Sequence, residues 1–282
     1  MILVTGATGV VGREVAGQLA AAGPVRILAR RPERLTVRGE GVEVVEGEYA
    51  DRAALDRALR GVASVFLVTN SPTEPDDERV AAAAAAAGVR HLVKLSMMAV
   101  EEPGADDFIT RLQRGNEQAI RDSGVPWTFV RPRTFMSNTL SWVPGIRSAG
   151  VVRALYGDAP VACVDPRDVA SVAVAVLTGT GHEGKAYAVS GPEAITAREQ
   201  TAQLSRVLGR SLRFEELDVG AARTALLAKY PPPVAEAFLE SAERQRGGAK
   251  AAVLPTIQEL TGRPARPFRV WSADHAAAFA PE

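Results

Sequence analysis

Three glycines near the N-terminus constrain the fold more than any other feature of the chain. Residues 2–4 form an apolar run that predicts a buried parallel strand. Gly6, Gly9 and Gly12 follow at a spacing of three. A helix is predicted directly after the turn, over 10–22, because its apolar residues share one stripe: Val11, Val15, Leu19 and Ala22. A strand, a glycine turn and a helix in this order are typical of a seat for the pyrophosphate of a dinucleotide.

The three glycines have different expected roles. The first allows the tight turn, the second lets phosphate approach the backbone, and the third lets the helix pack on the strand. The free N–H groups and the positive end of the helix dipole then face the anion. The alternative is that the glycines serve only a tight turn. The strand directly before them and the helix directly after them favour the nucleotide site.

Composition excludes several classes of partner. The chain has 282 residues, enough for one large or two small domains, and its 46% apolar and 23% charged residues are ordinary for globular proteins. Lys+Arg and Asp+Glu balance at 33 each, which argues against nucleic acid or an acidic membrane as the main partner. The first strand begins near residue 2, which argues against a signal peptide, and no apolar run reaches the ~18 residues of a membrane span. We therefore expect a cytoplasmic monomer or homodimer with a small-molecule substrate.

Cysteine and histidine usage predicts no disulfide and no metal site. Cys163 is the single cysteine, which excludes an intrachain disulfide and fits a reducing compartment. We interpret it as a small buried hydrophobic residue rather than a nucleophile. His91, His182 and His275 are scattered and lack metal-ligand spacing.

Strand and helix patterns alternate through the first half of the chain. Strands are predicted over 1–5, 25–29, 42–46, 62–68, 90–95 and 127–131. Helices are predicted over 10–22, 52–60, 76–87 and 106–123. Alternation with short connections, in strands rich in Val, Ile, Leu and Phe, predicts an α/β fold: a doubly wound parallel sheet with helices on both faces.

After Pro132 the pattern changes, and we expect a smaller C-terminal α/β lobe that binds substrate. Its predicted elements are a partly helical segment at 135–147, strands at 151–155, 161–164, 186–190 and 214–217, and helices at 166–178, 196–208, 219–229, 233–246 and 255–261. We divide the chain into a nucleotide-binding domain, 1–150, and a mainly substrate-binding lobe, 151–282, with some segments returning to the sheet. Ligands of such sheets bind beyond the carboxyl ends of the strands, where the lobe would cover them.

The end of the second predicted strand indicates which dinucleotide binds. Arg30 and Arg31 stand where a residue meets the adenosine ribose. A carboxylate there would select NAD, whereas arginine offers a forked cation to the 2′-phosphate of NADP. We predict NADP(H) as the preferred cofactor and NAD(H) as the alternative, unless these residues are only an exposed basic helix start. Glu48 is placed near the adenine amino group, with solvent exposure as its alternative, and Asp51 is favoured as a helix N-cap.

These features occur with further motifs that together resemble the NmrA-like, or atypical short-chain dehydrogenase/reductase, family. In order, the motifs are residues 5–12, Arg30, 47–51, Ser96, Glu117, 123–132, 135–138, 164–170, 184–187 and 191–193. The resemblance covers nearly the whole chain and implies a Rossmann-type fold that binds NADP(H) or NAD(H). The family includes quinone, azo-dye and other dye reductases, aromatic ether reductases, isomerases, and regulators that bind nucleotide without turnover.

The resemblance also implies which residues contact the cofactor. The glycine-rich segment would hold the pyrophosphate, Arg30 the 2′-phosphate, and Glu48 with Tyr49 the adenine, although the family pair at these two positions is Asp-Leu. Thr69 and Asn70 would line the nicotinamide ribose, and Met136 with Asn138 the nicotinamide end. The full implied set of cofactor-binding residues is Gly6, Thr8, Gly9, Val10, Val11, Gly12, Arg30, Glu48, Tyr49, Thr69, Asn70, Met136 and Asn138.

The sequence lacks the usual proton donor of short-chain dehydrogenases, because it contains no Tyr-x-x-x-Lys. Many reductases of the atypical group carry Lys or His on the helix after the fifth strand, and Gln113 stands at that position. Glutamine can hydrogen-bond a substrate but cannot cycle a proton. We predict Ser96 and Gln113 as the catalytic residues, with a plain strand-end hydroxyl as the alternative for Ser96. Arg114 would serve only as an electrostatic stabiliser, and Glu117, on the same helix face as Gln113, is favoured as an i,i+4 partner of Arg121.

The leading functional hypothesis is an NADPH-dependent reductase of a small, largely apolar conjugated molecule, such as a quinone-like, azo or other aromatic compound. Quinone-type acceptors are favoured because water can protonate their reduced products. Phe135, Trp142 and Tyr156 are candidates for the substrate pocket, with core packing as the alternative. The rival hypotheses are a nucleotide sensor without turnover and a non-redox isomerase or cyclase that retains the nucleotide.

Overall fold

Seven parallel strands form the central sheet of the protein, whose computed structural model describes residues 1–280. They are β1 (Ile2–Thr5), β2 (Val25–Ala29), β3 (Val42–Glu46), β4 (Ser64–Leu67), β5 (His91–Leu95), β6 (Trp127–Pro132) and β8 (Lys185–Val189). Their order in the sheet is β3-β2-β1-β4-β5-β6-β8, so the winding direction reverses between β1 and β4. The predicted doubly wound parallel sheet is confirmed, and its seventh strand comes from beyond residue 150.

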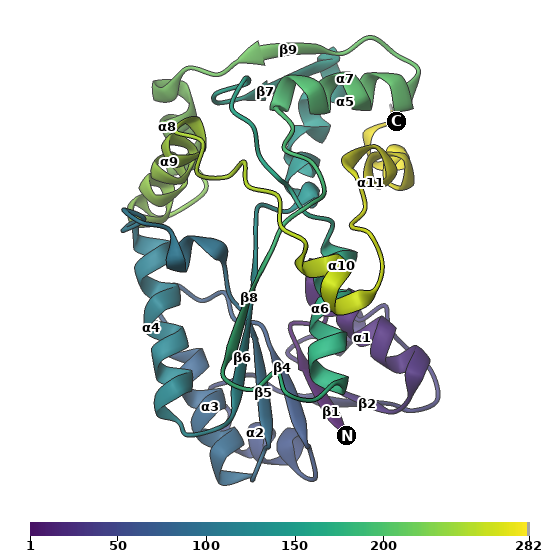
Figure 1. The fold of residues 1–282 in the computed structure, drawn as a ribbon, viewed down its shortest axis with the longest axis vertical. Coiled ribbons are helices and arrows are strands. Elements are labelled where there is room, and N and C mark those ends of the chain that lie inside the picture. Colours follow the sequence, from purple (N-terminus) through teal and green to yellow (C-terminus); the bar gives the residue numbers. More distant parts are fainter. Residues whose placement is uncertain (281–282) are drawn as a thin grey trace.

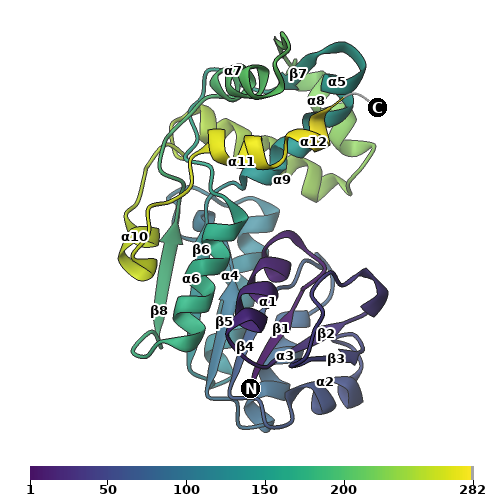
Figure 2. The ribbon, with the colours of Figure 1, turned by 90° about the vertical axis from the view of Figure 1, so that its right-hand side faces the viewer.

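Helices cover both faces of the sheet. One face carries α1 (Val10–Ala22), α6 (Pro166–Thr178) and α10 (Thr256–Thr261), and Figure 2 shows α1 and α6 side by side in front of the strands. The other face carries α2 (Arg52–Leu59), α3 (Asp76–Ala86) and α4 (Phe108–Asp122). Three of these helices begin at an aspartate whose carboxylate accepts a backbone N–H of the first turn: Asp51, Asp107 and Asp165. The predicted N-cap role of Asp51 is thereby confirmed.

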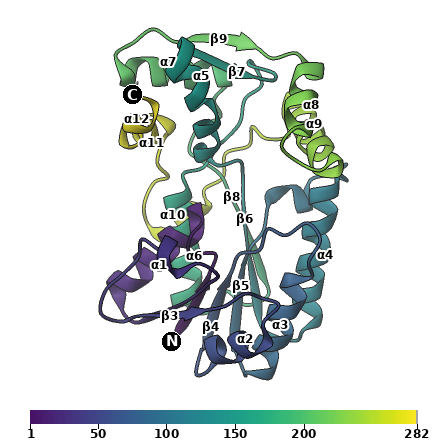
Figure 3. The same cartoon turned by 180° about the vertical axis from the view of Figure 1, so that it is seen from behind.

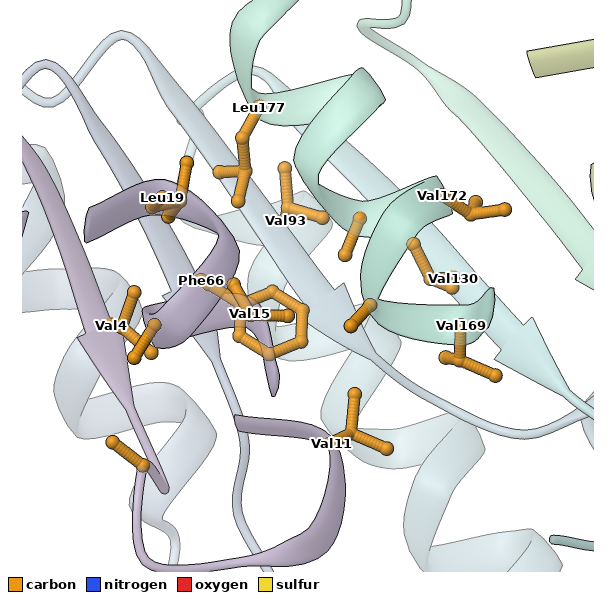
Figure 4. Close-up of a cluster of buried hydrophobic side chains, with 14 of the residues drawn as sticks. Val4, Val11, Val15, Leu19, Phe66, Val93, Val130, Val169, Val172 and Leu177 are labelled. Atoms are coloured by element: carbon orange, nitrogen blue, oxygen red, sulfur yellow. The ribbon is translucent and has the colours of Figure 1, made fainter. Parts of the chain in front are cut away.

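Two apolar clusters fix the helices to the sheet. The cluster under α1 and α6 is built from valines and alanines around Phe66, which has no exposed surface (Figure 4). These short side chains allow the two helices to approach the sheet and each other closely. The cluster on the opposite face surrounds Leu3, Leu92 and Phe129. Burial on both sides explains why the central strands are continuously apolar.

A smaller lobe stands beyond the carboxyl ends of the strands (Figure 1). Its elements are the 3-10 segment Met136–Trp142, α5 (Val143–Ala149), β7 (Val151–Ala154), α7 (Ala197–Leu208), β9 (Arg213–Glu216), α8 (Val219–Leu227), α9 (Pro232–Arg246), α11 (Phe268–Asp274) and α12 (Ala276–Phe279). β7 and β9 form a separate parallel pair. A third apolar cluster holds the lobe together and includes Met136, Phe268, Trp271 and Phe279. Figure 3 shows α9 next to the upper end of α4, at the right of the view.

The structure of the second half of the chain differs from the sequence-based prediction at two places. The strand expected over 161–164 does not form, because the ends of this segment make only isolated bridges, Phe135 to Val164 and Val161 to Ile195. The short helices α11 and α12 were not predicted. They depend on three aromatic residues that are buried in the third cluster, so tertiary packing rather than local periodicity stabilises them.

The start of α1 meets the end of β1 at two glycines. Gly6 has a φ of +64°, and a Cβ there would lie 2.7 Å from Cβ of Val68. Gly12 is buried, and a Cβ there would lie 2.3 Å from the carbonyl oxygen of Gly6. Any side chain at Gly12 therefore pushes α1 away from the strand.

We predict that Gly12→Ala lowers the free energy of unfolding by about 1–3 kcal/mol, because the added methyl overpacks rigid backbone. Gly115, on the exposed face of α4, is the matched control, since a Cβ there meets nothing within 4 Å. Gly115→Ala should raise stability by about 0.5–1 kcal/mol. Urea denaturation of both variants measures the difference. Equal effects of the two substitutions would show that the close contact at Gly12 is unimportant.

Candidate functional site

A cleft of about 390 Å³ opens at the carboxyl ends of β1, β2 and β4. Its lining residues are Gly6, Ala7, Thr8, Gly9, Leu28, Ala29, Arg30, Arg31, Gly47, Glu48, Tyr49, Ala50, Val68, Asn70, Ser71, Glu74, Asp76 and Arg79. The cleft lies at the point where the strand order reverses, which is where α/β sheets of this kind bind ligands.

The glycine turn that leads into α1 forms one wall of this first cleft. Gly6, Thr8 and Gly9 line it directly. Val10 begins the helix and is 44% exposed, whereas Val11 is buried in the apolar cluster behind the turn. Val11 can therefore serve an anion only through its backbone N–H, one of the helix-start N–H groups without an intrahelical acceptor. The wall offers N–H groups and no carboxylate, since the first turn of α1 holds no acidic residue.

Two arginines and one glutamate border the part of the cleft beside β2. Arg30 and Arg31 are exposed and line the cleft, as Glu48 does on the neighbouring loop. Arg79, also in the lining, is already paired with Glu74 at 2.8 Å and with Asp76 at 3.3 Å. Arg30 and Arg31 are therefore the cations of this cleft best able to receive a further anion.

Tyr49 and Thr5 hold Val68 in place at the bottom of the cleft. The Tyr49 hydroxyl donates to the Val68 carbonyl at 2.7 Å, and the Val68 N–H donates to the Thr5 hydroxyl at 2.9 Å. Burial raises the pKa of Tyr49 to about 12, so the phenol stays protonated and remains a donor. Tyr49, which stands where the family has Leu, thus connects the loop after β3 to the end of β4 by a hydrogen bond.

A second cleft, of about 290 Å³, continues from the first, and Val68 lines both. Its other lining residues are Thr69, Leu95, Ser96, Met97, Met98, Ala99, Glu102, Gln113, Pro132, Arg133, Thr134, Phe135, Asn138, Ser241 and Lys250. They come from the ends of β4, β5 and β6, from α4, and from α9 of the lobe and the segment after it. The cleft lies between the sheet and the lobe.

A buried ion pair lies behind Thr69 at the junction of the clefts. Nζ of Lys94, on β5, lies 2.7 Å from Oδ1 of Asp77, and neither side chain is more than 3% exposed. Lys94 also donates to the Thr69 hydroxyl, which donates in turn to Asp77. Burial lowers the pKa of Lys94, and the Asp77 carboxylate acts in the opposite direction. Because the Thr69 proton is committed to Asp77, its oxygen is left to accept a hydrogen bond from a ligand hydroxyl.

Ser96 is part of a second buried network. Its hydroxyl donates to Oε1 of Glu117 at 2.6 Å, and Glu117 is held by the guanidinium of Arg131 through bonds of 2.8 and 2.6 Å. Arg121 also contacts Glu117, at 3.1 Å, so the predicted i,i+4 pair exists, and Glu117 itself has no exposed surface. The buried partner Arg131 was not foreseen, because it lies on β6 and has no fixed spacing from Glu117. With its proton held by Glu117, Ser96 presents lone pairs rather than a donor to the cleft.

Gln113 lines the cleft with an amide that the protein leaves partly unused. Its Oε1 is buried and accepts no hydrogen bond within the described chain. Its neighbour Arg114 instead donates to the carbonyl of Val100 at 2.9 Å and does not line the cleft. A buried amide with an unused oxygen can hydrogen-bond a ligand entering the cleft.

The structure separates the other predicted site residues into two groups. Phe135 and Asn138 line the second cleft, and Asn70 lines the first. Met136 is fully buried in the third apolar cluster, and Trp142 packs against that cluster. The Tyr156 hydroxyl donates to Glu243 in the lobe, outside both lining sets. Of the three aromatic candidates, only Phe135 lies where a substrate in this cleft would touch it.

The charged residues at the lobe side of the second cleft were not predicted from the sequence. These are Glu102, Arg133 and Lys250, together with the hydroxyl of Ser241. They lie far apart in the sequence, and no periodicity connects them. The one available signal was the position of Arg133, directly after the sixth strand.

Other polar candidates play structural parts. The Cys163 thiol is buried, and burial raises its pKa to about 12, which confirms its interpretation as an inert buried side chain. The three histidines bond to Thr128, Tyr187 and the Trp271 carbonyl, and none of them lines either cleft. Within residues 1–280, no group of three or more His, Cys, Asp or Glu is arranged to hold a metal ion. Among the helices of these residues, none has both the length and the apolar character of a membrane span.

Comparison with protein families identifies the class. The model of the NmrA-like family matches residues 1–253, and the chain belongs to that family. The resemblance inferred from the sequence motifs is thereby confirmed.

Individual relatives are reductases. A (4-alkanoyl-5-oxo-2,5-dihydrofuran-3-yl)methyl phosphate reductase of Streptomyces griseus is 89% identical over 282 residues, with full coverage of both chains. An NAD(P)H azoreductase of Xenophilus azovorans is 37% identical over 99% of both chains. Among solved structures, the Escherichia coli NADPH-dependent quinone oxidoreductase in complex with NADPH superimposes with a TM-score of 0.84 at 28% identity, over 97% of this chain and 99% of that one. All three relatives are reductases or oxidoreductases, and the azoreductase and the quinone oxidoreductase are NAD(P)H-dependent, which is the class predicted from the sequence.

We predict that Glu117→Ala lowers the free energy of unfolding by about 3 kcal/mol, because it removes the buried carboxylate that holds Arg131 and leaves this arginine only the exposed carboxylate of Glu101 among the described residues. Ser96→Ala removes one hydrogen bond from the same network and should lower it by about 1 kcal/mol. Urea denaturation of the two variants gives the comparison. A Glu117→Ala effect no larger than that of Ser96→Ala would contradict the assignment of the buried pair as the main interaction.

Proposed function

We propose that this chain is an NADPH-dependent reductase whose substrate is a (4-alkanoyl-5-oxo-2,5-dihydrofuran-3-yl)methyl phosphate. The observation that carries the proposal is the 89% identity, over the full length of both chains, to a reductase named for that substrate. The two connected clefts supply space for a dinucleotide and for a small substrate at its reactive end.

The first cleft would hold the adenosine and pyrophosphate half of the cofactor. Gly6, Thr8 and Gly9 and the N–H groups that begin α1 would face a pyrophosphate there, and Arg30 would face a 2′-phosphate. Glu48 and Tyr49 would border the adenine. The nicotinamide ribose would then lie past Val68, beside Thr69 and Asn70, with the ring reaching the second cleft near Asn138.

The named substrate is an unusually good hydride acceptor. Its ring double bond joins C3, which bears the phosphate-carrying methylene, to C4, which is flanked by the lactone carbonyl and the alkanoyl carbonyl. NADPH, when bound, supplies the hydride. Addition of hydride to C3 leaves an enolate that is spread over both carbonyl groups, and one proton added at C4 completes the reduction. NADP⁺ and the saturated lactone are the products.

The residues of the second cleft suit this acceptor. An enolate shared by two carbonyl groups can take its proton from water, so the glutamine at the position of the family's Lys or His is no obstacle. The Nε2 amide group of Gln113 would donate a hydrogen bond to one carbonyl oxygen and orient the ring. The Ser96 hydroxyl already donates its proton to Glu117, so it would accept a hydrogen bond in the cleft rather than donate a proton to the substrate. Leu95, Met97 and Met98 offer an apolar wall on which an alkanoyl chain can lie.

We predict that the purified chain consumes NADPH when given the synthetic dihydrofuranone phosphate. With NADPH deuterated at nicotinamide C4, the deuterium should appear at ring C3 of the product. Absorbance of NADPH and mass spectrometry with NMR of the product measure both. Tight NADPH binding with no consumption would instead support the sensor hypothesis. An altered product without NADPH consumption would support the isomerase or cyclase hypothesis.

Coenzyme choice gives a second prediction. Arg30→Asp should raise the Kd of NADPH about 30-fold, because it removes a charge-assisted bond to the 2′-phosphate. The Kd of NADH should change by about 3-fold or less. Arg34→Asp is the control for general charge effects, because Arg34 is exposed and does not line the cleft. Equal weakening of both coenzymes by Arg30→Asp would refute the assignment of Arg30.

A further inference from the structure

One end of the second cleft is lined by polar side chains from three separated segments. Arg133 follows β6, Ser241 lies on α9, and Lys250 lies shortly after α9. Glu102 follows the 3-10 turn Met98–Glu101. The lobe thus brings a lysine and a hydroxyl to the same opening as an arginine of the sheet. The same cleft also contains Ser96 and Gln113, so this end is continuous with the reacting centre proposed above.

The cations at this end outnumber the carboxylates. Arg133 pairs with Glu102, while Arg244 contacts Asp107 at 2.7 Å and Glu102 at 3.5 Å. The remaining cation is Lys250, whose Nζ donates to the neutral hydroxyl of Ser241 at 2.7 Å. No carboxylate of the described chain forms an ion pair with Lys250. One positive charge is left facing the cleft.

The same groups leave hydrogen-bonding capacity unused. Arg133 is only 7% exposed, and its Nε is buried without a hydrogen-bond partner within residues 1–280. Burial lowers the pKa of Lys250 to about 8, with Arg244 and Arg133 acting in the same direction and Glu102 and Asp107 against it. An anion placed between Lys250 and Arg133 would offset the burial and stabilise the protonated amine.

We propose that Arg133, Lys250 and Ser241 form the subsite for the phosphate group of the substrate. This inference rests on the proposed function, in which the substrate carries a phosphate on the methylene attached to ring C3. Lys250 carries the one charge at this end that no carboxylate of the described chain neutralises, and it can bind a phosphate dianion together with the unused Nε of Arg133 and the Ser241 hydroxyl. Anchoring there would hold ring C3 at a fixed distance from the subsite and so orient it toward the nicotinamide.

A different role for Lys250 makes a different prediction. As a general acid, Lys250 would donate the proton that reaches ring C4, and its loss would lower turnover of any dihydrofuranone acceptor. As a phosphate anchor, it acts only on substrates that carry the phosphate. A pair of substrates that differ in the phosphate alone therefore separates the two roles.

The experiment compares the phosphate ester with its hydroxymethyl counterpart, each reduced by the full chain with saturating NADPH. The readout is the preference, which is kcat/KM for the phosphate ester divided by kcat/KM for the hydroxymethyl compound. Lys250→Met should lower this preference about 30-fold, mainly through KM, as expected for one charged hydrogen bond. Ser241→Ala should lower it about 3–10-fold. Lys185→Met is the matched control, because Lys185 is exposed at the amino end of β8, whereas the cleft lies at the carboxyl ends of the strands. It should leave the preference unchanged.

An equal loss on both substrates in Lys250→Met would overturn the subsite and favour the general acid. An unchanged preference in both Lys250→Met and Ser241→Ala would also overturn it. Lys250→Arg provides the conservative rescue, because a guanidinium keeps its charge and its hydrogen bonds to phosphate.

The pH dependence is a second arm of the same test. Phosphate monoesters are dianions above about pH 6–7, so the ligand charge is constant in the alkaline range. Lys250 loses its proton as the pH rises through about 8, and KM for the phosphate ester should therefore rise there. In Lys250→Arg this rise should disappear. A rise that persists in Lys250→Arg would assign it to another group.

Binding measurements separate failure of this subsite from failure of the proposed function. Calorimetry with the phosphate ester is performed on protein saturated with NADP⁺, so that the Arg30 end of the first cleft is already occupied. Binding that is lost in Lys250→Met supports the subsite even if no reduction occurs. Absence of binding by the unsubstituted protein would overturn both the subsite and the proposed substrate.

Discussion

The close contact between the start of α1 and the end of β1 is the constraint on which the rest of the site depends. Gly12 lies directly over the carbonyl of Gly6, and Gly6 itself leaves room for Val68. Because no side chain intervenes, the start of α1 stays close to the glycine turn that lines the first cleft. The same contact positions α1 against α6, so the nucleotide seat and the largest apolar cluster are parts of one packing arrangement. A larger residue would disturb stability and the anion site together.

Val68 connects this arrangement to the second cleft. Its backbone is held by Thr5 on one side and Tyr49 on the other, and the residue borders both clefts. The next residue, Thr69, is held by the buried pair of Lys94 and Asp77. The chain at the junction is therefore fixed by hydrogen bonds on every side. Such rigidity suits a site that must keep a nicotinamide and a substrate at a constant separation.

The sequence predicted the sheet, the glycine turn and most helices, because each depends on local patterns. Apolar runs marked the buried strands, and residues such as Asp51 marked helix starts. The isolated bridges at Val161 and Val164 were mistaken for a strand, since an apolar run does not reveal whether it has a pairing partner. The networks at the second cleft were also missed. Glu117 with Arg131, and Lys250 with Arg133, are brought together by the topology and the lobe, and no sequence spacing encodes them.

The missing proton donor and the cationic end of the second cleft have a common explanation. An enzyme without an acid at the position of Gln113 is restricted to acceptors whose anionic intermediate is already stable. A ring carbon between two carbonyl groups meets that requirement. Without an acid to bind the reacting carbonyl strongly, affinity and orientation must come from a remote part of the substrate. A phosphate held by Lys250 and Arg133 would supply both, because its binding energy is available before the hydride moves. Under the proposed function, the hydrogen-bonding groups near the ring and the charges that bind the phosphate are therefore complementary.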